Sequence, residues 1–161
     1  MRRLLPILAL CLAPALLQAA MEVPVDLQVA IFKKVLKFDA TLADAEHAAI
    51  VVVHAGDARA AGVMADAFKG AGFKATISEA GAALGAAKVS YFCPGSEAAA
   101  ARMPAGVLTL GCGAAPVEQN KVAVGVGMVD GKPKLMVSLA AYNASGHAID
   151  TQVLGLARIY R

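Results

Sequence analysis

The sequence predicts an α/β fold with three layers: a mostly parallel sheet of about four parallel strands, closed by an antiparallel hairpin, with helices on both faces. The apolar run at residues 49–54 does not alternate with polar residues, which is typical of a strand covered on both faces, and further strand-like runs follow at residues 89–93 and 107–110. Helix-forming segments separate these runs. Such a β-α repetition favours a parallel sheet with right-handed crossovers.

Residues 23–38 predict the first helix. Pro24 suits its first turn, and the lysines that end at Lys37 suit the negative C-terminal end of the helix dipole. One apolar stripe of this helix consists of Val25, Val29, Phe32 and Leu36. A second apolar stripe runs beside it, so the apolar face is wide. That face either covers the sheet or serves in part as an interface with another chain, such as a second copy.

The middle of the chain supplies the repeating units. We expect strands at residues 49–54, 73–77, 89–93 and 107–110. We expect a helix at residues 58–69, a small helical turn at residues 80–84, and a further helix after Ser96, whose side chain suits an N-cap. The helical crossovers place these four strands parallel to one another.

The last third of the chain follows a different pattern. Residues 122–129 and 134–139 flank Asp130-Gly131-Lys132-Pro133, a tight hairpin signal that predicts an antiparallel pair. A terminal helix is expected to begin after a cap at Asp150 or Thr151. Its apolar face carries Val153, Leu156 and Tyr160.

Residues 1–20 resemble a secretory signal peptide. Arg2 and Arg3 precede an apolar run at residues 4–17 that is too short to span a bilayer comfortably, and small residues follow it. Residues 21–161 then form a single domain, which we expect to be soluble and periplasmic, with no stable membrane insertion after cleavage. Cleavage removes two arginines and lowers the formal charge from +3 to +1, so nucleic acid is not an expected partner.

Cys93 and Cys112 are the two cysteines in the predicted mature chain. Each ends an expected parallel strand, and neighbouring strands would bring their Cα atoms within the ~4.4–6.8 Å that a disulfide spans. An oxidising compartment favours that bond, so we predict a disulfide. His54 also ends a strand, and open α/β sheets bind ligands at this edge, so His54, Cys93 and Cys112 are candidate ligand-binding residues. Their spacing is not that of a metal motif, so we predict no metal site.

The chain contains no recognisable catalytic motif. The glycine pairs Gly111-Cys112-Gly113 and Gly125-Val126-Gly127 do not continue as G-x-G-x-x-G into a helix, and they fit turns or close packing better. His147 and Asp150 have no nucleophile context around them. We therefore predict no enzymatic activity, no catalytic residues and no cofactor.

Three segments of the chain carry a family resemblance. Residues 27–38, Leu-Gln-Val-Ala-Ile-Phe-Lys-Lys-Val-Leu-Lys-Phe, form the first. The strands before Gly56-Asp57 and before Ser96-Glu97 form the second. Residues 134–141, Lys-Leu-Met-Val-Ser-Leu-Ala-Ala, which lead through Gly146 into a terminal amphipathic segment, form the third. Together they resemble the YfiR-like family of periplasmic regulatory proteins, as a divergent member that lacks the Trp-Pro often found after the first segment.

The resemblance implies a function. The best-known members of that family are periplasmic, dimerising inhibitors of membrane-bound diguanylate cyclases, and disulfides tune their stability and repression. It implies a non-enzymatic exported regulatory or sensory protein that acts in cyclic-di-GMP signalling, or on a sensor kinase, through the periplasmic domain of that membrane signalling protein. It also implies a homodimer. The alternative from the residues is a periplasmic small-molecule-binding module.

Overall fold

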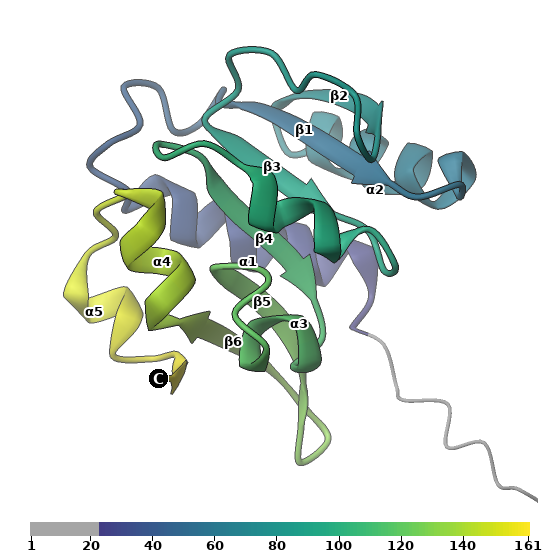
Figure 1. The fold of residues 1–161 in the computed structure, drawn as a ribbon. Coiled ribbons are helices and arrows are strands. Elements are labelled where there is room, and N and C mark those ends of the chain that lie inside the picture. The colour runs from purple at the N-terminus through teal and green to yellow at the C-terminus, as the bar shows by residue number, and fades with distance from the viewer. Residues whose placement is uncertain (1–22) are drawn as a thin grey trace, which may run out of the picture.

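A seven-stranded sheet forms the centre of the computed structural model, which describes residues 23–161 (Figure 1). The strands lie in the order β2-β1-β3-β4-β5-β6-β7. Their bounds are β1 Ala49–His54, β2 Lys74–Glu79, β3 Val89–Phe92, β4 Leu108–Cys112, β5 Val124–Val129, β6 Lys132–Ser138 and β7 Arg158–Tyr160. The helices are α1 Val25–Lys37, α2 Ala58–Gly70, the 3₁₀ helix η1 Glu97–Arg102, α3 Ala115–Glu118, α4 Leu139–Ser145 and α5 Thr151–Leu154.

The pairing of the strands confirms the predicted fold class. The strands β2, β1, β3, β4 and β5 run parallel to one another, β5 and β6 form an antiparallel pair, and β7 lies parallel to β6. Two parallel pairings were not expected: the first strand of the hairpin also pairs with β4, and β7 pairs with β6. The hairpin turn contains two residues, Asp130 and Gly131, with φ values of 51° and 71°. Such positive φ values at both positions are typical of a type I′ turn.

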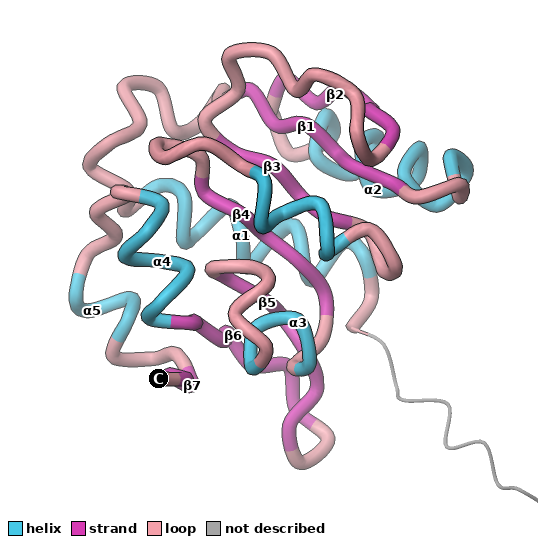
Figure 2. The backbone as a smooth tube through the Cα atoms, in the orientation of Figure 1, coloured by secondary structure: helices cyan, strands magenta, loops and turns pink. Residues whose placement is uncertain are grey.

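Helices cover both faces of the sheet. Figures 1 and 2 show α1 and α2 on one face, and η1, α3 and α4 on the other. The two faces have separate cores. Side chains of α1 and α2 pack with Ile50 and Val52 of β1, whereas side chains of η1 and α3 pack with Val51 and Val53. This alternation follows from the two-residue period of a strand.

The stripe of α1 that we considered as an interface is buried inside the protein. Val29, Phe32 and Leu36 are at most 3% exposed, and Val25 is partly buried against the same core. The Phe32 ring meets the Tyr91 ring edge-on at 5.9 Å between centroids. The interface hypothesis is therefore wrong for these side chains, because they cover the sheet of their own chain.

Two expected helices have a different form. Residues 80–84 form turns, and the segment after Ser96 is a 3₁₀ helix. Ser96 does precede that helix, but its hydroxyl donates to the carbonyl oxygens of Val53 and Cys93 and caps no amide. The short helix α3 was not expected at all.

The C-terminal segment also differs from the single amphipathic helix that we expected. It divides into α4, α5 and β7, because Gly146 ends α4 with a φ of 69° and residues 158–160 pair with β6. Leu156, assigned to an apolar helix face, is 80% exposed. The cap at Asp150 is confirmed, since its carboxylate accepts from the amide of Gln152.

The predicted signal peptide lies outside the described residues. Within residues 23–161, no helix is long and apolar enough to cross a membrane.

Candidate functional site

The three predicted ligand-binding residues meet at one edge of the sheet. The register pairs Val53 with Phe92 and Phe92 with Gly111. His54, Cys93 and Cys112 follow these residues directly, so they occupy one row at the carboxyl ends of three neighbouring strands. The sequence predicted this juxtaposition correctly. Because successive strand residues alternate between the two faces of the sheet, His54, Cys93 and Cys112 lie on the face that α1 and α2 cover.

No disulfide joins Cys93 to Cys112 in the structure, so the predicted bond is absent. Cys93 is buried, and burial raises the pKa of its thiol to about 11, with the charges of Asp57 and Glu97 adding to the effect. Such a thiol stays protonated at neutral pH and makes a poor nucleophile or metal ligand. Among residues 23–161, no three His, Cys, Asp or Glu side chains are arranged to hold a metal ion.

His54 contributes an unusual polar group to this row. Its Nδ1 atom is buried and has no hydrogen-bond partner within the described part of the chain. An unpaired buried nitrogen lowers stability, and such a group is a candidate for contact with a ligand. The row therefore offers one unpaired histidine nitrogen beside the protonated thiol of Cys93, and Cys112 is its partly exposed third member.

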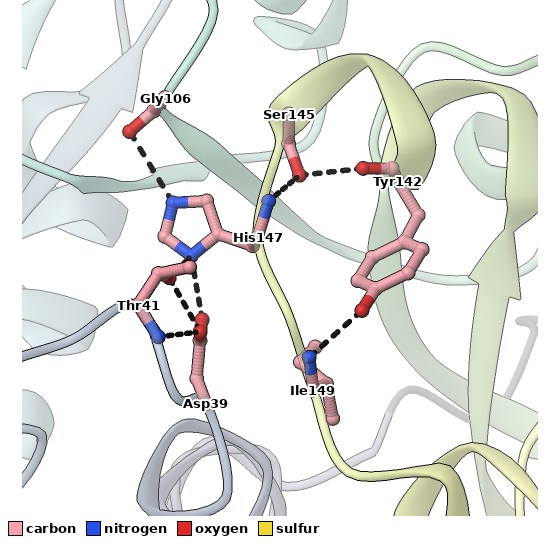
Figure 3. A network of polar contacts seen from close by, with 7 residues as sticks. All are labelled: Asp39, Thr41, Gly106, Tyr142, Ser145, His147 and Ile149. Atoms are coloured by element: carbon pink, nitrogen blue, oxygen red, sulfur yellow. Dashed lines mark hydrogen bonds and ion pairs between the residues drawn. The ribbon is translucent and has the colours of Figure 1, made fainter.

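A second polar group lies between α1 and the C-terminal segment (Figure 3). The side chains of Asp39 and His147 are 0% and 2% exposed, and Oδ2 of Asp39 lies 2.5 Å from Nδ1 of His147. Nε2 of His147 lies 3.2 Å from the carbonyl oxygen of Gly106. Both ring nitrogens therefore lie within hydrogen-bonding distance of oxygen atoms inside the protein, and Nδ1 also lies 2.9 Å from the Thr41 hydroxyl.

Thr41 completes the environment of Asp39. Its hydroxyl and its amide both donate to Oδ1 of that carboxylate, at 2.5 and 3.0 Å. Burial raises the pKa of Asp39, but the hydrogen bonds from His147 and Thr41 lower it more, so the net shift is downward. The result is a buried ion pair.

This Asp-His-Thr group resembles a catalytic arrangement only in composition. The side chains of Asp39 and His147 are buried and hydrogen-bonded within the protein, and only Thr41 of this group is exposed. Nearby contacts extend the network: the Tyr142 hydroxyl accepts from the amide of Ile149, and the Ser145 hydroxyl accepts from the amide of His147 (Figure 3). We interpret the group as a structural connection. The sequence does not reveal this group, because His147 stands close to Asp150 along the chain, whereas its partner Asp39 lies 108 residues away.

The glycine pairs have a packing role, as the sequence favoured. A Cβ atom on Gly125 would lie 2.4 Å from Cγ2 of Val117, a side chain of α3. A Cβ atom on Gly127 would lie 3.1 Å from the Cα atom of Gly113. These glycines allow α3 and the turn before it to lie directly on β5.

An exposed apolar surface lies at the β7 end of the sheet. Its large side chains are Phe38, 51% exposed, Leu156, 80% exposed, and Ile159, 38% exposed. The carbonyl oxygen of Phe38 accepts from the amide of Asp150, so the end of α1 lies beside the segment that leads to α5 and β7. We call these three residues the β7-end surface. The sequence did not indicate it, since Phe38 and Leu156 were both assigned to apolar helix faces.

Comparisons with known proteins support the fold alone. No protein-family model matches the chain, and no curated protein matches it. A crystal structure described as a conserved domain protein from Vibrio cholerae is similar, with a TM-score of 0.60 and 18% sequence identity. The match covers 86% of this chain and 60% of that one, so the chain spans less than two thirds of that protein. At this identity the likeness concerns the fold and carries no function.

Proposed function

We propose that the protein is a non-enzymatic, exported regulatory protein that modulates a membrane-bound signalling protein, a diguanylate cyclase or a sensor kinase, through the periplasmic region of that partner. The resemblance to the YfiR-like family supplies the class of partner. The observation that carries the proposal is the β7-end surface, where three large apolar side chains are exposed on neighbouring segments.

The position of this surface suits contact with another protein. Within residues 23–161, β7 is the last strand of the sheet, so no described strand pairs with its outer backbone groups. An open strand edge beside exposed apolar side chains is a common place for another chain to bind. Apolar side chains that stay in water contribute no burial free energy to the isolated protein. A partner that covered Leu156 and Ile159 would remove apolar area from water and stabilise the complex.

Charge defines the partner further. Arg158 lies in β7 beside Ile159, and Arg161 ends the chain, and both are exposed. The guanidinium of Arg158 lies 5.4 Å from the centre of the Tyr160 ring, which holds it close to the strand. The complementary surface therefore has an apolar centre with acidic residues beside it.

The interior of the protein agrees with a role in binding and not in catalysis. Three of the titratable groups that a catalyst could use are engaged or suppressed: Asp39 and His147 form a buried pair, and Cys93 stays protonated. These groups stabilise the fold, and we assign the binding of the partner to the β7-end surface.

A photo-crosslinking experiment in the native host tests the proposal. A photoreactive amino acid replaces Leu156 in one variant and Val63 in a control. Val63 is 55% exposed on α2, which packs on β1 and β2 at the other end of the sheet. We expect the probe at residue 156 to join to a membrane protein that carries a cyclase or kinase output domain, and the probe at residue 63 not to do so.

A functional measurement completes the test. Leu156→Asp is expected to leave the stability within about 0.5 kcal/mol, because the side chain is a surface one. It should weaken control of the partner and change its output, measured as cellular cyclic-di-GMP or kinase phosphorylation. Equal crosslinking at residues 63 and 156, or crosslinking at 156 to a second copy of this chain alone, would contradict the proposal.

A further inference from the structure

A cavity of about 540 Å³ lies on the face of the sheet opposite α1 and α2. Its floor contains Val53 of β1 and Ser90 of β3. One wall is the glycine- and alanine-rich loop that contains Gly81 and Leu84, and the other is the end of η1 with Met103. Binding sites for small molecules have volumes of about 300–1,000 Å³ and mostly apolar linings with few polar groups, so this cavity matches that description.

Ser90 is the first polar group of the cavity. It is 0% exposed, and its hydroxyl has no hydrogen-bond partner within residues 23–161. The register places it between Val51 and Thr109 on the same face of the sheet. The Thr109 hydroxyl has a role, because it accepts from the amide of Ala123. Ser90 has none, and an unused hydroxyl in a cavity floor points to a ligand that supplies the missing partner.

Arg102 is the second polar group. It lines the cavity near the C-terminal end of η1, and it is the one charged residue in the lining. No carboxylate among the lining residues opposes it. A guanidinium without a carboxylate partner, at the edge of an apolar cavity, favours an anion that accepts two parallel hydrogen bonds, and a carboxylate fits that geometry.

We propose that this cavity binds a small organic monocarboxylate, with the apolar body between Leu84 and Met103, the carboxylate at Arg102, and the Ser90 hydroxyl as an additional donor. A cation is disfavoured, because the lining has one positive charge and no negative one. The site lies on the sheet face that carries Val51 and Val53 and does not include the β7-end surface. The inference therefore goes beyond the proposed function and does not depend on it.

Titration of the purified protein with octanoate tests this inference, with octanamide as a neutral probe of nearly the same shape and octyl phosphate as a more highly charged one. We expect saturable binding of octanoate with one site per chain, measured by calorimetry and by ligand-observed NMR. Octanamide should bind at least ~10-fold more weakly, because a charged acceptor makes the stronger hydrogen bond with a guanidinium. Octyl phosphate should bind no more tightly than octanoate.

Three variants locate the binding site. Arg102→Gln should weaken octanoate binding about 10-fold, whereas Arg59→Gln, which removes an exposed arginine of α2 outside the cavity, should leave it unchanged. Ser90→Ala should weaken binding about 3-fold or more and at the same time raise the melting temperature, because it removes an unpaired buried hydroxyl. A merely structural serine would lower the melting temperature and leave the affinity unchanged.

Several results would overturn the inference. They are the absence of saturable octanoate binding, equal affinity for octanamide, tighter binding of octyl phosphate, equal effects of the Arg102 and Arg59 variants, and unchanged affinity in Ser90→Ala. Because the titration contains no membrane protein, failure here leaves the proposed partner contact to be judged by the crosslinking experiment alone.

Discussion

The two faces of the sheet are built differently. On one face, α1 and α2 each contain 13 residues and press aromatic rings onto the strands. Phe68 meets the Phe73 and Tyr91 rings, both at 5.8 Å between centroids. On the other face, η1 and α3 contain 6 and 4 residues and contribute mostly alanine and valine. The rings fill the first face where it meets the sheet, and the hollow of about 500 Å³ on that side lies between α1 and α2, whereas the cavity of the second face lies directly above Ser90 of the sheet. The comparison indicates that one face supplies most of the stability and the other is available for binding.

A substitution on the filled face should give the largest effect. Phe68→Ala is expected to lower the free energy of unfolding by about 4 kcal/mol, because it removes a ring that is 0% exposed and leaves a space its neighbours cannot fill. Leu84→Ala is the matched change at the cavity. It should lower that free energy by less than about 1 kcal/mol, because its side chain is only partly buried and the space already exists.

Urea denaturation followed by circular dichroism measures both variants. Similar losses in Phe68→Ala and Leu84→Ala would show that the two faces contribute equally to stability, and would remove the contrast between them.

The ion pair of Asp39 and His147 should give the second largest effect. It connects the end of α1 to the carbonyl of Gly106, shortly before β4. Asp39→Asn keeps the size of the side chain but removes the buried carboxylate that contacts His147 and accepts from Thr41, so we expect a loss of about 3 kcal/mol at neutral pH. Denaturant unfolding measures this loss.

The same pair predicts a pH dependence. Because the pKa of Asp39 is lowered in the folded state, the carboxylate contributes stability above its unfolded pKa of about 4, and this contribution disappears as the pH falls through the folded value. The stability of the natural chain should therefore decrease below about pH 4 more steeply than that of Asp39→Asn. Parallel curves for the two proteins between pH 5 and pH 2 would show that Asp39 does not carry this dependence.

The sheet was largely predictable from the sequence. Its strands are marked by local signals: an unbroken apolar run in β1, a mostly apolar run in β3, and a two-residue turn at Asp130 and Gly131 between β5 and β6. The parallel order follows from the helical crossovers. These features depend on neighbours along the chain, which a pattern can show.

What the sequence did not show depends on distant contacts. Leu156 reads as part of an amphipathic helix, but residues 158–160 gain strand hydrogen bonds from β6, and this pairing ends the helical segment at α5. Asp39 and His147 become partners only after the chain folds. The unpaired hydroxyl of Ser90 is likewise a property of its surroundings, because β3 reads as an ordinary apolar strand with one serine.

The smallest expected effect concerns the reactivity of the Cys93 thiol, which lies at the edge of the filled face. Its thiol has a pKa of about 11, raised mainly by burial, so at pH 8 it forms far less thiolate than the same cysteine in an unfolded chain. Alkylation of Cys93 by iodoacetamide should therefore be roughly 100-fold slower in the folded protein than in urea, a ratio measured by mass spectrometry of the peptide that carries it.

The same labelling tests whether a disulfide joins Cys93 to Cys112 at the edge of the filled face. Without reductant, denatured protein that lacks residues 1–20, and with them Cys11, should accept two labels, one on Cys93 and one on Cys112, because no disulfide joins them in the structure. If denatured protein purified from an oxidising compartment accepts none, the two cysteines become bridged after export. The row that contains His54 would then be fixed by a covalent bond, and the filled face would owe part of its stability to that bond as well as to its rings.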